Sequence, residues 1–426
     1  MNDLNLFLPC AAGVEDYLEP EVLRITGLDR QRVRRQRGGV ALEAGWRDVL
    51  RLNLHSRLAQ RVLVLLSHTP YRAEDDLYEA ASAVAWEAWF TPRQTIKVEI
   101  TAQHSPLQSL NFAALRIKDA VCDRFRARAG GVRPDVDTQR PDVRLFAHLS
   151  PDTCSMYIDT SGEPLFKRGW RDDTGDAPLK ETLAAAMLAA SGWADGPGPL
   201  LPLYDPCCGS GTIAIEAAQI ACRIAPGSRR RFAFERTLPF QRALWDAIKK
   251  EALEAELVRP EGSKPWVFGS DVAFRMVDFA QRNAQRAGVA GALEFRGGDA
   301  LQRLPPCDGP GVMLVNPPYG ERIGVAGVAA GRSRGGRQRA WMDPDLEAGT
   351  TGAQPDEGEF FTRLSAHWKK HYAGWTAWVL TPDLKLPGRM RLKESRRVPM
   401  WNGPIECRLF RFELVQGPVQ ARTGTP

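Results

Sequence analysis

Strand-like and helix-like segments alternate along the chain from about Ser161 onward, and this alternation constrains the fold more than any other feature. Short apolar runs separated by amphipathic stretches are typical of a parallel sheet with helices on both faces. The predicted strands span residues 200–204, 267–270, 293–295, 312–315 and 376–380. We therefore predict an α/β domain over residues 161–426.

Residues 325–358 interrupt this alternation. They are rich in Gly, Ala, Arg and Asp and show almost no apolar period. Such a segment buries too little apolar surface to offset the entropy that ordering it would cost. We expect a flexible insertion beside the site, not an element of the fold.

Residues 1–160 mix short strands and helices without an internal repeat. Strands are expected at 4–8, 32–35, 39–43, 61–66, 95–100, 143–149 and 155–159, and helices at 14–26, about 46–58, 75–87 and 111–128. Gly27 suits the C-cap of the first helix. This part of the chain is predicted to be a small α+β region.

Composition limits the class of protein. The chain has 426 residues, no run of eighteen apolar residues, and an N-terminus that does not resemble a secretory signal. We therefore expect a cytoplasmic protein that does not associate with a membrane. Its eight cysteines contain no C-x-x-C pair, which favours reduced thiols over disulfides or a zinc site, so no metal is predicted. The net charge of +6 is compatible with a polyanionic partner without requiring one.

A glycine-rich turn follows the first strand of the α/β domain, in the sequence Asp205-Pro-Cys-Cys-Gly-Ser-Gly-Thr212. Glycines are needed where the backbone turns tightly and approaches a ligand, and this turn resembles the relaxed dinucleotide fingerprint. The carboxylate before the glycines suits a cationic ligand better than a pyrophosphate. S-adenosylmethionine carries a sulfonium and an ammonium, so we predict that it binds to Asp205, Cys207, Gly209, Gly211 and Thr212. A glycine turn in some other α/β fold is the alternative.

Two later acidic residues fit the same ligand. Asp271 ends the second predicted strand, where its carboxylate can accept the ribose hydroxyls. Asp299 follows the third strand, within reach of the adenine amino group. The alternative for each is a surface or helix-capping carboxylate, and Asp271 precedes a predicted helix.

The tetrapeptide Asn316-Pro317-Pro318-Tyr319 follows a fourth apolar strand, at the edge where such sheets bind ligands. An exocyclic amino group on a purine is a poor nucleophile because its lone pair is delocalised. The Asn316 side-chain oxygen and the Pro317 carbonyl can accept its two N–H bonds and aim the lone pair at a methyl group. The prolines stiffen the loop, and Tyr319 can stack on an extruded base. A simple Asn-Pro turn is the alternative.

Several motifs together resemble a known family. Asn316 to Tyr319 with the glycine turn is similar to the amino-methylating methyltransferases. The segments at 166–171, 177–185 and 316–322 look like the bacterial 23S ribosomal RNA guanine-N2 methyltransferase family with a THUMP domain. This resemblance covers most of the chain and ends at the insertion after Gly324.

The resemblance implies three regions: a ferredoxin-like region at 1–45, a THUMP RNA-binding domain at 46–160, and a Rossmann-like methyltransferase domain at 161–426. It implies 23S rRNA, naked or in a ribosome-assembly intermediate, as the substrate. It also implies a single-methyltransferase form, since a second catalytic domain fused to some relatives is not found. Lys180 and Glu181 would lie beside the cofactor; ordinary surface charges at a helix start are the alternative.

Basic residues cluster in three places, at 30–37, 229–231 and 389–397, and such clusters can neutralise phosphates. A solvated charged face is the alternative for each cluster. Basic and acidic residues nearly cancel before Ser161, so the role of this region in RNA binding is inferred from the resemblance.

Other functions stay open. A transfer-RNA guanine-N2 or a DNA adenine-N6 methyltransferase would use the same tetrapeptide, and a noncatalytic RNA-binding or ribosome-assembly factor is possible from another class. A cysteine-nucleophile mechanism is disfavoured, because Cys207 and Cys208 lie on the cofactor side. His367 and His371 have the spacing of metal ligands but lack a general-base glutamate, and we expect them on a helix surface.

Overall fold

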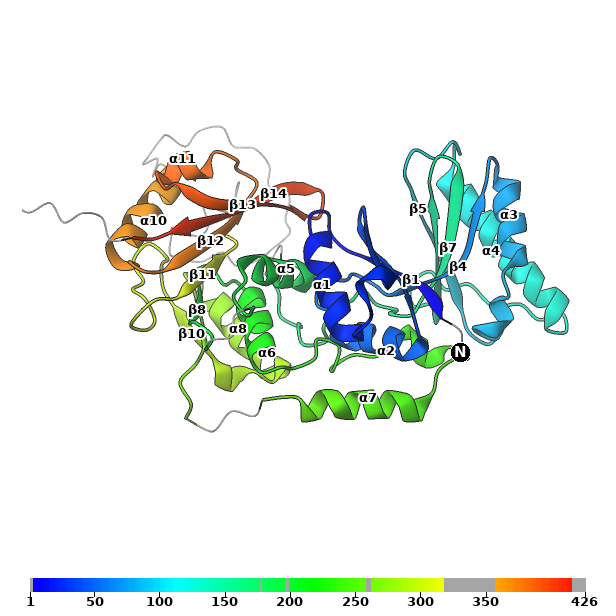
Figure 1. The fold of residues 1–426 in the computed structure, drawn as a ribbon, viewed down its shortest axis with the longest axis horizontal. Helices are drawn as coiled ribbons and strands as arrows, with labels where there is room; N and C mark the ends of the chain where they lie inside the picture. The colour runs from blue at the N-terminus through cyan, green and yellow to red at the C-terminus, as the bar shows by residue number, and fades with distance from the viewer. Residues whose placement is uncertain (1–2, 176–177, 196–198, 258–261, 318–356, 416–426) are drawn as a thin grey trace, which may run out of the picture. The chain divides into compact units, whose positions relative to one another are not determined.

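The computed structural model describes residues 3–175, 178–195, 199–257, 262–317 and 357–415 (Figure 1). The chain forms two compact units, and each unit consists of three separate stretches of the sequence. Unit 1 comprises residues 1–171, 180–190 and 219–258, and unit 2 comprises residues 172–179, 191–218 and 259–426. Within the described ranges, every helix is too short or too polar to cross a membrane.

Unit 1 is built on one seven-stranded sheet with the order β2-β3-β1-β4-β7-β6-β5. Its strands are β1 (Leu4–Pro9), β2 (Val33–Gln36), β3 (Gly39–Ala44), β4 (Leu63–Pro70), β5 (Ile96–Ala102), β6 (Val143–Leu149) and β7 (Thr153–Asp159). All neighbouring pairs are antiparallel except β5 and β6. Strand β4 pairs with β1 on one side and β7 on the other, so a single sheet runs through residues 4–159.

Helices cover unit 1, and in Figure 1 α3 and α4 lie together against the part of the sheet that contains β4 and β5. The helices are α1 (Glu15–Thr26), α2 (Trp46–His55), α3 (Glu74–Ala83), α4 (Leu110–Arg128), α5 (Glu181–Ser191) and α7 (Arg242–Glu254), with 3₁₀ turns η1 (Arg30–Arg32), η2 (Trp86–Ala88) and η3 (Ala233–Arg236). Gly27 caps α1 with a left-handed φ of 71°, as its position predicted. The predicted helix at 75–87 was too long, because α3 ends at Ala83 and the Trp86 indole donates a hydrogen bond to the Ala81 carbonyl.

Unit 2 contains the second seven-stranded sheet, with the order β10-β9-β8-β11-β12-β14-β13. Its strands are β8 (Leu203–Asp205), β9 (Val267–Asp271), β10 (Leu293–Gly297), β11 (Val312–Val315), β12 (Thr376–Thr381), β13 (Glu394–Asn402) and β14 (Ile405–Glu413). The five strands β10, β9, β8, β11 and β12 are parallel, which confirms the predicted Rossmann-like α/β fold. The antiparallel pair β13 and β14 was not predicted; it extends the sheet beyond β12.

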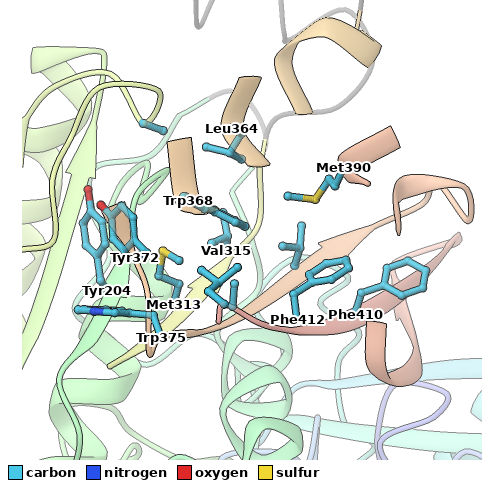
Figure 2. Packing of buried hydrophobic residues seen from close by; sticks show 14 of the residues in the cluster. Tyr204, Met313, Val315, Leu364, Trp368, Tyr372, Trp375, Met390, Phe410 and Phe412 are labelled. Atoms are coloured by element: carbon cyan, nitrogen blue, oxygen red, sulfur yellow. The ribbon is translucent and has the colours of Figure 1, made fainter. Parts of the chain in front are cut away.

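A buried aromatic core fixes the middle of this sheet (Figure 2). The helices of unit 2 are α6 (Thr212–Ala221), α8 (Phe274–Ala287), α10 (Glu357–His371) and α11 (Leu386–Met390), with the 3₁₀ turn η4 (Ala290–Ala292). Trp368 of α10 packs with Met313 and Val315 of β11 and with Phe410 and Phe412 of β14. The Tyr204 and Tyr372 rings stack with centroids 6.3 Å apart, so the end of β8 is held against the same core.

Two sequence predictions in unit 2 need correction. The first strand begins at Leu203 and not at residue 200, since Pro202 has no N–H to donate to a neighbouring strand. The apolar spacing of Ile213, Ala217, Ile220, Ala221 and Ile224 predicts one helix face, but α6 ends at Ala221 and Ile224 lies beyond it.

Candidate functional site

The carboxyl ends of four neighbouring parallel strands carry most of the predicted site residues. Asp205 is the last residue of β8, and Asp271 is the last residue of β9. Asp299 follows β10 by two residues, and Asn316 follows β11 directly. Because β10, β9, β8 and β11 are adjacent and parallel, these side chains lie along one edge of the sheet, where α/β proteins bind ligands.

The glycine turn between β8 and α6 is held by the end of β9. The Gly209 N–H donates to a carboxylate oxygen of Asp271 at 3.0 Å, and the Cys208 N–H donates to the Ser270 carbonyl at 2.9 Å. Gly209 has a φ of 52°, and a Cβ there would meet no atom within 4 Å. Gly211 has a φ of 89°, but its missing Cβ would lie 3.0 Å from Ala280. Gly211 therefore allows close packing, whereas Gly209 leaves open space over the turn.

Asp205 places a buried carboxyl group at the end of β8. Its side chain is 1% exposed and accepts a hydrogen bond from the Cys207 N–H at 3.1 Å. Burial, with a smaller contribution from the negative charge of Asp271, raises the pKa of Asp205 to about 8. No described Lys or Arg forms an ion pair with it. A cationic ligand at this position would favour the ionised form.

The negative charges of the three predicted acidic residues all affect the thiol of Cys207. Burial raises the pKa of the Cys207 thiol well above its ordinary value, and the negative charges of Asp205, Asp271 and Asp299 raise it further. Asp271 is not the N-cap of α8, which is Ala273; its carboxylate accepts the N–H groups of Gly209 and Ala273. Asp299 accepts the Leu301 N–H at 2.9 Å. The edge of the sheet is thus a concentration of carboxyl groups.

Asn316 has a buried side-chain oxygen that accepts no hydrogen bond from any described residue. Pro317 beside it is buried as well. A buried acceptor without a donor costs about 1–3 kcal/mol, so a substrate N–H that fills it would be favoured. Pro318, Tyr319 and residues 325–356 of the insertion predicted at 325–358 lie outside the described residues. The last two residues of the predicted insertion begin α10 instead.

Thr212, Lys180 and Glu181 were also predicted to bind the cofactor. Thr212 is buried and begins α6, directly after the glycine turn. Glu181 begins α5, is 3% exposed and forms an ion pair with Arg171 at 2.9 Å. The Lys180 ammonium lies 5.2 Å from the centre of the Phe166 ring. Lys180 and Glu181 belong to unit 1, so their role at the sheet of unit 2 stays a prediction.

One residue of this edge was not predicted from the sequence: Phe274, the first residue of α8. The Phe274 ring is 80% exposed, although it lies so close to Gly297 that a Cβ on this glycine would be 2.6 Å from it. An exposed aromatic ring between Asp271 and the end of β10 offers a flat apolar surface to a ligand. An apolar residue three positions after a strand-end acid was the available signal.

The surroundings of His367 and of two cysteines bear on the alternative roles that the sequence left open for them. His367 was expected on a helix surface, but it is half-buried, and its Nε2 lies 2.7 Å from the Arg303 carbonyl oxygen. Burial also raises the pKa of the Cys208 thiol well above its ordinary value. The Cys207 and Cys208 thiols are therefore protonated at neutral pH, which disfavours a cysteine nucleophile.

Family models match three consecutive parts of the chain. Residues 5–63 match the RlmL ferredoxin-like domain, residues 71–159 match the THUMP domain, and residues 168–330 match the RMKL-like methyltransferase domain. The site described above falls within the last of these matches.

Individual proteins agree with these models. The chain is 36% identical over 411 residues to the ribosomal RNA large subunit methyltransferase K/L of Shewanella amazonensis, which covers 96% of this chain and 53% of that protein. The chain thus spans about half the length of the curated relatives it matches. Two solved structures are each 26% identical. One is SMU.472, assigned as a methyltransferase and complexed with SAH, with a TM-score of 0.79 over 98% of this chain and 99% of that chain. The other is from Listeria monocytogenes, a predicted N6-adenine-specific DNA methylase, with a TM-score of 0.78 over 97% and 96%.

These matches confirm the resemblance drawn from the motifs. The chain carries, in order, an RlmL ferredoxin-like domain, a THUMP domain and an RMKL-like methyltransferase domain.

Proposed function

We propose that this protein is an S-adenosylmethionine-dependent methyltransferase that methylates the exocyclic N2 amino group of a guanine in 23S ribosomal RNA. The observation that carries the proposal is the buried, unfilled acceptor of Asn316 at the strand edge that also holds three carboxyl groups. The Asn316 oxygen suits a substrate amine, and the carboxyl groups suit a cationic methyl donor.

Each carboxyl group would bind a different part of the methyl donor. Asp205 is placed to pair with a ligand ammonium, because it is buried and has no described counter-ion. Asp271 and Asp299 would accept hydrogen bonds from the ribose and the adenine, and the Phe274 ring would lie against the adenine. The open space over Gly209 lets the ligand approach the backbone. S-adenosylmethionine supplies an electrophilic methyl group when it is bound; SAH is bound by the related protein SMU.472.

Asn316 and Pro317 position the amine. The amino N–H groups donate to the Asn316 side-chain oxygen and the Pro317 carbonyl, so the nitrogen lone pair points away from the ring plane. As the new N–C bond forms, the methyl–sulfur bond breaks, and one amino proton leaves to solvent. The loop contributes orientation and no charged base, which is the kind of catalysis that fixed geometry provides.

The proposal that the substrate is RNA is supported by the THUMP match in unit 1 and by the names of the relatives. The THUMP match covers residues 71–159, and the Shewanella amazonensis relative is named for large-subunit ribosomal RNA. A naked transcript or an assembly intermediate would present the guanine, because a base must leave its stack to reach an edge of this kind. Cytoplasmic localisation and the region boundaries at 45/46 and 160/161 remain proposals of the same kind.

The test combines cells and purified protein. Mass spectrometry of ribosomal RNA from cells without this gene should show the loss of one N2-methylguanosine. With purified protein, Asn316→Ala should reduce labelled-methyl transfer by at least about a hundredfold, the size typical of losing one positioned hydrogen-bond partner. Its affinities for RNA and SAH should be unchanged.

Asn316→Asp is the matched control, since its carboxylate keeps an acceptor in the same place and should retain more transfer than the alanine variant. Unaltered transfer by Asn316→Ala would refute the mechanism. Intact rRNA with altered DNA adenine or tRNA guanine would replace the substrate, and absence of SAH binding would favour a noncatalytic RNA-binding role.

A further inference from the structure

Two adjoining hollows in unit 1 have several basic side chains in their linings. The larger has a volume of about 690 Å³ and the smaller about 220 Å³. They share Arg231, Glu235 and Arg242, so they lie next to each other, and together they are called the groove. Its walls come from Leu54 and from three stretches of sequence, residues 139–144, 161–167 and 227–249. None of these residues belongs to the strand edge that carries the proposed methyl-transfer site.

The groove concentrates positive charge. The basic residues of the larger hollow are Arg140, Arg144, Lys167, Arg231, Arg236 and Arg242, and the smaller hollow adds Arg230 and Lys249. Only three acidic residues, Asp142, Glu163 and Glu235, oppose these eight. The groove thus has an excess of five positive charges in a chain whose formal net charge is +6.

Some of these charges are already used inside the protein. Arg236 pairs with Asp142, Lys167 pairs with Glu163, and Arg144 donates to Glu99 at 2.7 Å. In contrast, Arg140, Arg231 and Arg242 are exposed and form no ion pair with a carboxylate among the described residues. These three guanidinium groups are available to a ligand.

The backbone beneath Arg231 is rigidly held. The neighbouring Arg230 donates to the carbonyl oxygens of Pro164 at 2.7 Å and Lys167 at 3.0 Å. The Phe234 N–H donates to the Thr160 carbonyl at 2.9 Å, and a Cβ on Gly169 would lie 2.4 Å from the Arg229 carbonyl oxygen. Burial, reinforced by the charge of Arg168, lowers the pKa of Arg230 to about 10. The hydrogen bonds of Arg230 therefore hold this segment in place, and Arg231 is attached to a fixed backbone.

We propose that this groove binds the phosphate backbone of the RNA substrate, with Arg140, Arg231 and Arg242 as the phosphate ligands. This inference rests on the proposed function and adds a site to it. A lone small anion needs only one or two such side chains, whereas three unpaired guanidiniums along two adjoining hollows match a chain of successive phosphates. Residues 219–258 enclose part of the groove, so a segment that lies within the methyltransferase match serves the RNA-binding unit.

The test measures how RNA affinity depends on salt. Each phosphate contact contributes about 0.7–0.9 to the slope of log affinity against log salt. The double variant Arg231→Gln/Arg242→Gln should lower that slope by about 1.5 for a naked 23S rRNA transcript and weaken binding by about tenfold at moderate salt. The matched control, Arg93→Gln/Arg128→Gln, removes two exposed charges of unit 1 that line neither hollow and should keep the wild-type slope.

Two further variants separate the possible outcomes. Arg231→Lys/Arg242→Lys keeps both charges and should keep the slope, which excludes a folding defect as the cause of a change in the glutamine variant. An equal slope for the wild type and Arg231→Gln/Arg242→Gln overturns the groove proposal and leaves methyl transfer untouched. A wild-type protein that binds RNA through the groove but transfers no methyl group would instead refute the proposed function.

Discussion

The buried carboxyl of Asp205 should lower the stability of unit 2 in the absence of ligand. Its folded-state pKa of about 8 lies above the ordinary value of 3.8, so the folded state binds a proton that the unfolded state releases. For a raised carboxyl pKa, stability is greatest below about pH 4 and falls as the pH rises towards 8. At pH 7 the cost is about 1.36 kcal/mol for each of roughly three pH units, or about 4 kcal/mol.

Asp205→Asn removes this titration and keeps an oxygen that can accept the Cys207 N–H. The variant should be more stable than the wild type at pH 7 and should lose most of that advantage at pH 5. The change in advantage between the two pH values is about 3 kcal/mol, from two pH units at 1.36 kcal/mol each. This difference is insensitive to how well the amide packs, because packing contributes equally at both pH values.

Hydrogen exchange measures this quantity for unit 2 alone. Peptides from β9, β11 and β12 report the free energy of opening at pH 5, 6 and 7, after correction for the intrinsic pH dependence of exchange. SAH affinity of the same variant should fall, since the ammonium loses its partner. A stability difference that stays constant with pH would show that Asp205 is ionised or well solvated in the folded protein, and the reasoning would fail.

Three other properties of the site can be measured. Wild-type affinity for SAH in calorimetry should fall about tenfold per pH unit below about pH 8, because the ammonium needs ionised Asp205; a flat profile would contradict the pairing. Phe274→Ala should weaken SAH binding by about tenfold without changing the melting temperature, since the ring is 80% exposed; equal binding would remove it from the site. Gly211→Ala should destabilise unit 2 by about 1–3 kcal/mol in hydrogen exchange, and more than Gly209→Ala, because only Gly211 has a neighbour 3.0 Å from the added Cβ.

The parallel part of the fold could be predicted from sequence because strands such as β9, β11 and β12 are short, buried and largely apolar runs. Asp205, Asp271 and Asn316 could be placed at one sheet edge for the same reason. Strands β13 and β14 gave no such signal. In β13, Val398 and Met400 are buried, but Arg396, Arg397 and Pro399 are exposed, and we interpreted residues 389–397 as a basic cluster.

The remaining misses depend on tertiary contacts. Phe274 is exposed, so it belongs to no periodic pattern of buried apolar residues. Its place at the sheet edge follows from its contact with Gly297. The motif at 166–171 was informative about the family, yet its Arg168 is buried and donates to the Leu165 and Arg57 carbonyls. The buried hydrogen bonds of Arg168 therefore give this residue a packing role within unit 1. The separate roles of Arg230 and Arg231 could likewise not be read from three consecutive arginines.

The exchange of segments between the two units has a consequence for synthesis on the ribosome. Unit 1 needs residues 219–258, which are made after the first strand of unit 2. At about 5–20 residues per second, the interval between the end of its second segment at residue 190 and residue 258 is about 3–14 s. During that time the sheet of β1 to β7 lacks the segment that packs beside Thr160 and Gly169. Unit 1 therefore completes its fold only after the first strand of unit 2 has been made, and the arginine groove cannot form before then.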